Sequence, residues 1–146
     1  MRRRTGAALL TLGAAVVAGL TGCTASPSTA SLTVTFTDGT EQTTQEVSFS
    51  DLACRTSSVN RVFVSESTLS SGENEFLASA PTDGRDAYAI SFWFGDYSFV
   101  STAKFDASGS TVTFDALPGF VAESLNGERA TSAGVEATLD GTITCN

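Results

Sequence analysis

The feature that most constrains the fold is an alternation of apolar and polar side chains that recurs along the chain. The stretch "SLTVTFT" places Leu32, Val34 and Phe36 on one face, and residues 111–116 ("TVTFDA") repeat the pattern. A period of two is the period of a β-strand, and Asp-Gly, Gly-Asp and Asn-Gly pairs between such runs are typical of tight turns. The pattern predicts an all-β domain, an antiparallel β-sandwich or strongly curved sheet of about seven to eight strands. Only residues 121–125 suit a short helix.

Each predicted turn can be tested by side-chain parity, that is, by whether the turn keeps the apolar residues of the two strands on the same face of the sheet. With Asp38-Gly39 as a two-residue loop, Phe36 lies opposite Glu41 and Val47 falls on the same face as Phe36, so a hairpin is consistent.

A turn at Asp140-Gly141 fails the same test, because Leu139 and Ile143 would then lie on opposite faces of the sheet. We therefore expect one continuous C-terminal strand, with Gly141 on its inner face.

The stretch "AISFWFGDYSFVSTAKF" predicts the most informative hairpin. A Gly95-Asp96 loop places Phe92 opposite Phe99, and this aromatic face continues to Phe105. The other face carries Lys104, a residue type that is rarely buried, so the aromatic face is the core face. Trp93 and Val100 are then left on the outer face.

The N-terminal residues form an export signal. Three arginines precede a run of fourteen mostly apolar residues, which is too short to span a membrane as a helix and suits a signal peptide. The alternative is an uncleaved membrane anchor. The run ends in "LTGC", which resembles the bacterial lipobox. In that motif the thiol, here that of Cys23, is joined to diacylglycerol, and cleavage leaves the lipidated cysteine as the first residue. Residues 1–22 are thus predicted to be a lipoprotein signal peptide.

The three cysteines fit this interpretation. If Cys23 carries lipid, Cys54 and Cys145 are left as one pair in an oxidising compartment. A bond between them would close a loop of about 90 residues, worth about 4–5 kcal/mol in the chain-entropy model. Two free buried thiols are the alternative.

Residues 23–31 are small and polar after the cysteine, which predicts a flexible tether that is either plain or O-glycosylated. The β domain is expected to occupy residues 32–146.

The charge of the mature chain limits its partners. Three of the eight basic residues precede the apolar run, so from Cys23 onward five basic residues accompany all sixteen acidic ones, a net charge of −11. Such a chain, with its few cations scattered along the sequence, repels nucleic acid and anionic lipid headgroups. We expect no nucleic-acid partner, and attachment to the membrane by the lipid on Cys23 and not by charge.

The sequence offers no catalytic or metal-binding constellation. It contains no histidine, which removes Ser-His-Asp triads and histidine metal sites. The stretch "STAK" matches the S-x-x-K motif of penicillin-binding proteins, but in a strand Ser101 and Lys104 point to opposite faces. The acidic pairs, Glu73 with Glu75 and Asp83 with Asp86, are interpreted as solvated loop charges. We expect no catalytic residue, no metal and no cofactor.

An outward-facing tryptophan is the best candidate for ligand contact. Trp93 with Val100 beside it is able to stack on a sugar or to accept an acyl chain. The alternative is that a connecting segment, for example Phe76 and Leu77, covers the tryptophan as a small satellite cluster.

The mature chain resembles the mycobacterial nineteen-kilodalton lipoprotein antigen family. The matching features are the lipobox cysteine, a Thr/Ser/Ala tether, the strand-to-turn stretch "VTFTDG", and the two cysteine contexts "FSDLAC" and "ITCN". The departures are a shorter tether and a richer aromatic hairpin. The resemblance implies an antigenic cell-envelope lipoprotein with no established catalysis, whose relatives are described as adhesins and, through their acyl chains, as ligands of Toll-like receptors.

Together these features predict an actinobacterial, lipid-anchored protein on the extracytoplasmic face of the cell membrane that acts by binding or display and is not an enzyme. A carrier or binder of an envelope lipid or glycolipid is the alternative. The partner is an unknown protein or glycolipid.

Overall fold

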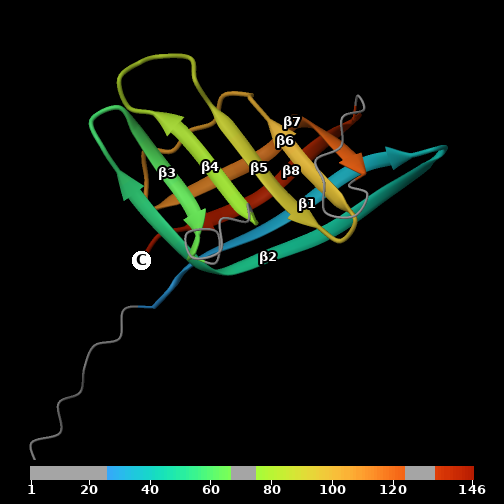
Figure 1. Cartoon of the computed structure of the whole chain (residues 1–146), viewed down its shortest axis with the longest axis horizontal. Helices are drawn as coiled ribbons and strands as arrows, with labels where there is room; N and C mark the ends of the chain where they lie inside the picture. Colours follow the sequence, from blue (N-terminus) through green and yellow to red (C-terminus); the bar gives the residue numbers. More distant parts are fainter. Residues whose placement is uncertain (1–25, 67–74, 124–133) are drawn as a thin grey trace, which may run out of the picture.

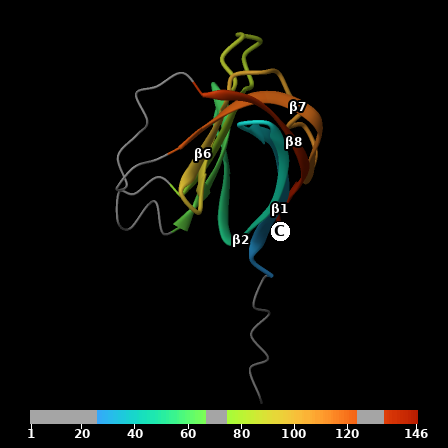
Figure 2. The ribbon, with the colours of Figure 1, turned by 90° about the vertical axis from the view of Figure 1, so that its right-hand side faces the viewer.

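A computed structural model describes residues 26–66, 75–123 and 134–146. Its strands are β1 (Ser28–Asp38), β2 (Glu41–Thr56), β3 (Asn60–Ser65), β4 (Phe76–Pro81), β5 (Ala89–Phe94), β6 (Tyr97–Ser101), β7 (Thr111–Glu123) and β8 (Val135–Thr144). Each strand pairs antiparallel with the next, and β8 pairs with β1, so the sheet closes into an eight-stranded barrel (Figure 1). Figure 2 shows the sheet curling round on itself. The predicted fold class, an all-β antiparallel sheet of strong curvature with one disulfide, is confirmed.

Aromatic side chains fill the centre of the barrel. Phe76, Phe92 and Phe99 are fully buried, and the ring of Phe92 stacks on the other two at centroid distances of 5.9 and 5.2 Å. Phe49 on β2 packs against the same group from across the barrel. An eight-stranded barrel has an interior just wide enough for side chains, and here large rings occupy it.

The β5–β6 hairpin follows the register that the sequence predicts. Phe92 lies opposite Phe99, and Gly95 begins the turn with a φ of 56°, which suits a glycine-first hairpin loop. The aromatic face is the core face, as expected.

The β1–β2 hairpin is also confirmed, but its register differs by two residues. Phe36 lies opposite Thr43, where Glu41 was expected, and the loop is Gly39-Thr40. Only Gly39 has a positive φ, of 64°, so the turn moves by one residue to place the glycine first. The shift keeps parity, so Val47 still faces the core.

The C-terminal strand is continuous, as parity requires. Gly141 lies opposite both Leu32 on β1 and Phe114 on β7, at a φ of 125°. A side chain there would collide with the backbone of Ser31, so the glycine lets β1 and β8 approach closely.

Strand β7 carries a bulge that reverses its side-chain parity. Asp115 and Ala116 together oppose the single residue Asp140, and Ala116 has a φ of 46°. The backbone N–H of Ala116 donates a 2.8 Å hydrogen bond to the Asp140 carboxylate, which holds the bulge. The helix expected from residue 121 is wrong for the described part of that stretch, since Val121 is a buried residue of β7.

The tether is shorter than the predicted 23–31. Strand β1 begins at Ser28, and the buried residues Ser28 and Ala30 pair with β2 while Thr29 and Ala30 pair with β8. Small side chains fit here because the two neighbouring strands approach on both sides. Residues 23–25 lie outside the described residues, as does the whole predicted signal peptide, 1–22.

The barrel has two contrasting ends. The crosslinked end is defined here as the start of β1, the segments 57–59, 82–88 and 102–110, and the residues that follow β8; it lies to the left in Figure 1. The hairpin end is defined by the turns 39–40 and 95–96, the end of β7 and the start of β8.

Candidate functional site

Three large apolar side chains lie on the outside of the barrel wall, where β5, β6 and β7 run side by side. Val100 and Phe120 are directly opposite each other on β6 and β7, and they are 48% and 55% exposed. Trp93 on β5 is half-buried and lies diagonally across from Val100. We call Trp93, Val100 and Phe120 the outer-wall cluster.

The parity of the β5–β6 hairpin predicted the outward positions of Trp93 and Val100. Phe76 does not cover Trp93, because its ring is fully buried inside the barrel. Leu77 lies on the outer face of β4, opposite Ser91 and on the same face as Trp93.

Phe120 is the member of the cluster that the sequence did not reveal. Without the bulge, Phe120 would share the inward parity of Val112 and Phe114; with it, Leu117 and Val121 point inward and Phe120 points out. The sequence does contain a signal for this bulge: the inward apolar residues lie at even positions up to Phe114 and at odd positions from Leu117 onward.

Gly119 on β7 allows the strands beneath the outer-wall cluster to pack closely. A side chain at this buried position would lie within 2.8 Å of the Val100 carbonyl oxygen and would also strike the ring of Phe99. The absence of a side chain lets Phe99 pack against the β7 backbone, so Val100 and Phe120 are held on a rigid support.

A groove of about 800 Å³ runs from the cluster across the outer wall toward β1 and β2. Val100, Pro118 and Phe120 supply apolar lining, and hydroxyl, amide and carboxylate groups supply the rest. The polar side chains are those of Thr35, Thr37, Gln42, Thr102, Glu136 and Thr138. An apolar edge beside hydroxyl and amide groups, with the Glu136 carboxylate among them, suits an uncharged polar ligand or a peptide better than an anion.

The predicted disulfide is present at the crosslinked end. Cys54 at the end of β2 is bonded to Cys145 after β8, across 91 residues of sequence and a Cα–Cα distance of 6.0 Å. The alternative of two free thiols is therefore wrong.

Hydrogen bonds near the disulfide also join the residues after β8 to the neighbouring segments. The N–H of Cys145 donates to the carbonyl of Ser110 at 2.8 Å, and the N–H of Asn146 donates to the hydroxyl of Ser28 at 3.0 Å. The Asn146 side chain donates to the carbonyl of Pro27 at 3.1 Å. The two ends of the described chain are thus held together.

The side chain of Arg61 links β3 to the segment 102–110 in the middle of the crosslinked end. Its guanidinium lies 5.1 Å from the ring centroid of Phe63, and Nη1 donates to the carbonyl oxygens of Ala107 and Gly109. The Nε atom of Arg61 is buried with no hydrogen-bond partner. Beside it the buried ring of Phe105 packs edge-on against other rings.

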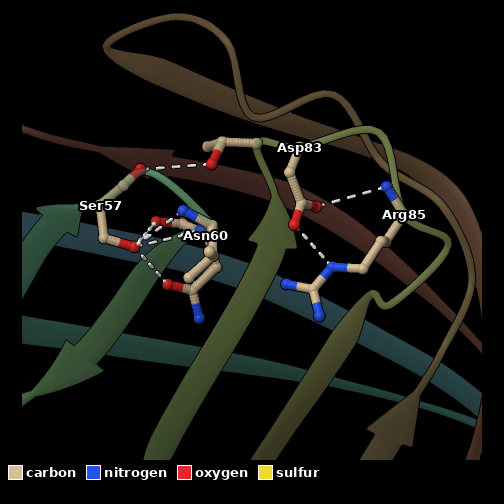
Figure 3. Close-up of polar contacts among 6 residues, drawn as sticks. Ser57, Asn60, Asp83 and Arg85 are labelled. Atoms are coloured by element: carbon tan, nitrogen blue, oxygen red, sulfur yellow. Dashed lines mark hydrogen bonds and ion pairs between the residues drawn. The ribbon is translucent and has the colours of Figure 1, made fainter.

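Polar contacts join the adjacent turn and loop (Figure 3). The hydroxyl of Ser57 donates to Asn60, and the hydroxyl of Thr82 donates to the Ser57 carbonyl at 3.2 Å. Arg85 Nε donates to the Asp83 carboxylate at 2.7 Å, and this bond holds the pKa of Asp83 below its ordinary value. The Asp83 carboxylate is therefore paired with Arg85.

Every lysine and arginine among the described residues lies at the crosslinked end: Arg55, Arg61, Arg85 and Lys104. The expectation that the cations are scattered is wrong in space, because β2, β3 and the two adjoining loops bring them to one rim. Asp83, Asp86 and Asp106 lie at this end as well, so its net charge is small.

The hairpin end is acidic instead. Its carboxylates are those of Asp38, Glu41, Asp96, Glu123 and Glu136. The hydroxyl of Tyr97 donates to the Asp38 carboxylate at 3.1 Å, and this bond, with the charge of Asp38, raises the pKa of Tyr97.

The structure places the remaining candidate groups apart. Ser101 is buried and donates its hydroxyl hydrogen to the Pro118 carbonyl, whereas Lys104 is exposed, so the S-x-x-K pair does not form. Within residues 26–66, 75–123 and 134–146 there is no cluster of three or more metal-ligating side chains. Glu73 and Cys23 lie outside the described residues.

No protein-family model matches this chain, and neither a curated protein nor a solved structure is detectably similar to it. None of the described segments is a helix long and apolar enough to cross a membrane.

Proposed function

We propose that this chain is a non-catalytic, lipid-anchored lipoprotein of the cell envelope, whose barrel acts by binding or display through the outer-wall cluster. The lipid is carried by Cys23, and the protein is located on the extracytoplasmic face of the cell membrane. Two observations support export: the signal-like N-terminal pattern and the disulfide, which is typical of oxidising compartments. The resemblance to the nineteen-kilodalton antigen family remains a prediction.

The observation that carries the binding role is the adjacent exposure of Val100 and Phe120. The barrel already has a filled aromatic interior, so the fold does not need these two side chains on its outer wall. Neighbouring exposed apolar residues beside a groove are typical of surfaces that bind partners.

The anchor is tested by membrane fractionation of the full chain. The Cys23→Ala variant should move from the membrane fraction to the soluble fraction. The Cys54→Ala/Cys145→Ala variant, which keeps Cys23, is the matched control and should stay with the membrane. Unchanged fractionation of the Cys23→Ala variant would reject the lipid anchor.

The binding surface is tested with fluorescently labelled Cys23→Ala protein on cultured mammalian cells, so that acyl chains make no contribution. Adding Phe120→Ser should lower cell binding at least tenfold. Val59→Thr, at an exposed apolar residue of the crosslinked end, is the control and should not change it. Equal binding by all three proteins would remove the outer-wall cluster from the proposed function.

The groove favours one second candidate, recognition of a glycolipid through its sugar. Large rings occupy the interior of the barrel, so an acyl chain has no evident place there, whereas hydroxyl and amide groups beside Phe120 suit a sugar. Native mass spectrometry of protein extracted in mild detergent should then show a retained glycolipid that Phe120→Ser removes. Spectra without bound glycolipid would reject this candidate.

A further inference from the structure

We propose that the crosslinked end of the barrel rests on an anionic lipid bilayer, with Arg55 and Lys104 facing the phospholipid headgroups and the hairpin end facing away. The proposal rests on the lipid anchor at Cys23 and deepens it, because it names the surface that faces the membrane. It also reverses the expectation that charge plays no part at the membrane.

The first support is the short reach of the chain between lipid and barrel. Strand β1 begins at Ser28, and the carbonyl of Pro27 is already bonded to Asn146. From Cys23 to Ser28 is five residues, which span at most about 18 Å when fully extended. A lipid on Cys23 therefore holds the start of β1, and with it the crosslinked end, within about 18 Å of the headgroups.

The second support is the separation of charge between the two ends. Arg55 and Lys104 are exposed at the crosslinked end, and Arg85 is exposed beside them. Basic residues are attracted to an anionic leaflet within a Debye length, about 8 Å at physiological salt. The acidic hairpin end is repelled by the same surface. Both effects favour one orientation.

The crosslinked end also offers room for a headgroup. A hollow of about 460 Å³ opens between the loops there, and Arg61, Lys104, Thr82, Tyr88 and Ser108 line it together with Asp106. The hydrogen bond from Ser108 to the Asp106 carboxylate keeps the pKa of that acid below its ordinary value, so it stays ionised beside Lys104. The hollow therefore suits the glycerol headgroup of an anionic phosphatidylglycerol, whose phosphate lies nearer Arg61 and Lys104.

The orientation is tested by fluorescence quenching of the lipidated protein in vesicles of phosphatidylglycerol that carry a nitroxide on a fraction of the headgroups. Trp93, the only tryptophan, reports on the outer wall nearer the hairpin end. The Ser58→Trp/Trp93→Phe variant places the probe in the exposed 57–59 turn instead. We expect strong quenching in the variant and little quenching of Trp93.

The charge contribution is tested by adding Arg55→Gln and Lys104→Gln to the Ser58→Trp/Trp93→Phe variant. Loss of two basic contacts should lower the ratio of docked to undocked protein about 25-fold in phosphatidylglycerol vesicles. Glu41→Gln/Glu123→Gln, at the hairpin end, is the matched control and should leave quenching unchanged. In phosphatidylcholine vesicles the Gln substitutions should have no effect.

Equal quenching of the two probe positions, or quenching that ignores the Arg55 and Lys104 substitutions, would overturn the proposed orientation while leaving the anchor intact. Failure of the protein to enter vesicles or the membrane fraction at all would instead reject the lipid anchor on which the orientation depends.

Discussion

The two ends of this barrel are held by different kinds of interaction. The crosslinked end depends on a few specific bonds: the Cys54–Cys145 disulfide, the contacts of Arg61 with two carbonyls, and the bonds of Asn146. The hairpin end depends on aromatic packing, where Phe36, Phe94 and Tyr97 contact one another with centroid distances of 5.1 to 6.2 Å.

The difference follows from how the chain closes the barrel. The described chain begins and ends at the crosslinked end, so strands β1 and β8 have no turn there to fix them and need other ties. At the hairpin end short turns already join β1 to β2 and β5 to β6, and apolar packing is sufficient. The two ends should therefore respond to different perturbations.

Removing the disulfide should have the largest effect. The Cys54→Ala/Cys145→Ala variant should lose about 4–5 kcal/mol of unfolding free energy, because the closed loop of the unfolded chain is released. Urea unfolding without reductant measures the loss, and wild-type protein with reductant should match the variant. A loss below about 1 kcal/mol would show that hydrogen bonds alone hold the crosslinked end.

Deleting an aromatic ring should weaken the hairpin end by a different mechanism. Phe36 is 3% exposed, and Phe36→Ala should cost about 3–4 kcal/mol through lost burial and a residual cavity. Phe120→Ala, on the outer wall, is the control and should cost about 0.5 kcal/mol at most. Similar losses in urea unfolding would contradict the assignment of inner and outer faces.

Replacing the arginine at the centre of the crosslinked end should have an intermediate effect. Arg61→Met keeps the apolar stem and leaves the carbonyls of Ala107 and Gly109 without their donor, at a cost of about 2 kcal/mol. Amide hydrogen exchange should increase in segment 102–110 and not in the hairpin end. Arg85→Met removes only an exposed ion pair and should change much less.

The smallest expected effects are on the pH dependence of stability, which should differ between the two ends. The hydrogen bond from Arg85 lowers the pKa of Asp83 below 3.8, so this contribution is present above that pH and is lost as pH falls through the lowered pKa. The hydrogen bond to Asp38 raises the pKa of Tyr97 above 10.0, so that contribution is present below pH 10 and is lost as pH rises through the raised pKa.

Urea midpoints measured across pH test both signs. Asp83→Asn should flatten only the acid limb of the curve, and Tyr97→Phe should flatten only the alkaline limb. If either substitution changed the opposite limb, the corresponding hydrogen bond would not be the cause.

Much of the fold follows from side-chain parity alone. The register of Phe92 against Phe99 and the unbroken strand through Gly141 are both present as the alternation predicts. Parity works in these places because a slip of one residue would move every core side chain to solvent. Closure into a barrel could not be predicted, since the β1–β8 pairing joins strands that are far apart in the sequence.

Two features that were not predicted from the sequence, the β7 bulge and the gathering of cations, have identifiable physical causes. The bulge at Asp115 and Ala116 turns Phe120 outward, and it depends on a hydrogen bond that the Ala116 N–H donates to the Asp140 carboxylate on the neighbouring strand β8. The gathering of cations at one rim likewise depends on how the loops meet. Trp93 and Val100 were predicted because an unbroken hairpin sets their face.

The proposed anchor is tested most directly by the intact mass of the protein extracted from membranes under non-reducing conditions. A lipid-anchored protein should give a chain that begins at Cys23, carries the added mass of a diacylglycerol and any N-linked acyl chain, and has no alkylatable thiol. A chain that retains residues 1–22, or that takes up an alkylating reagent at Cys23, would contradict it.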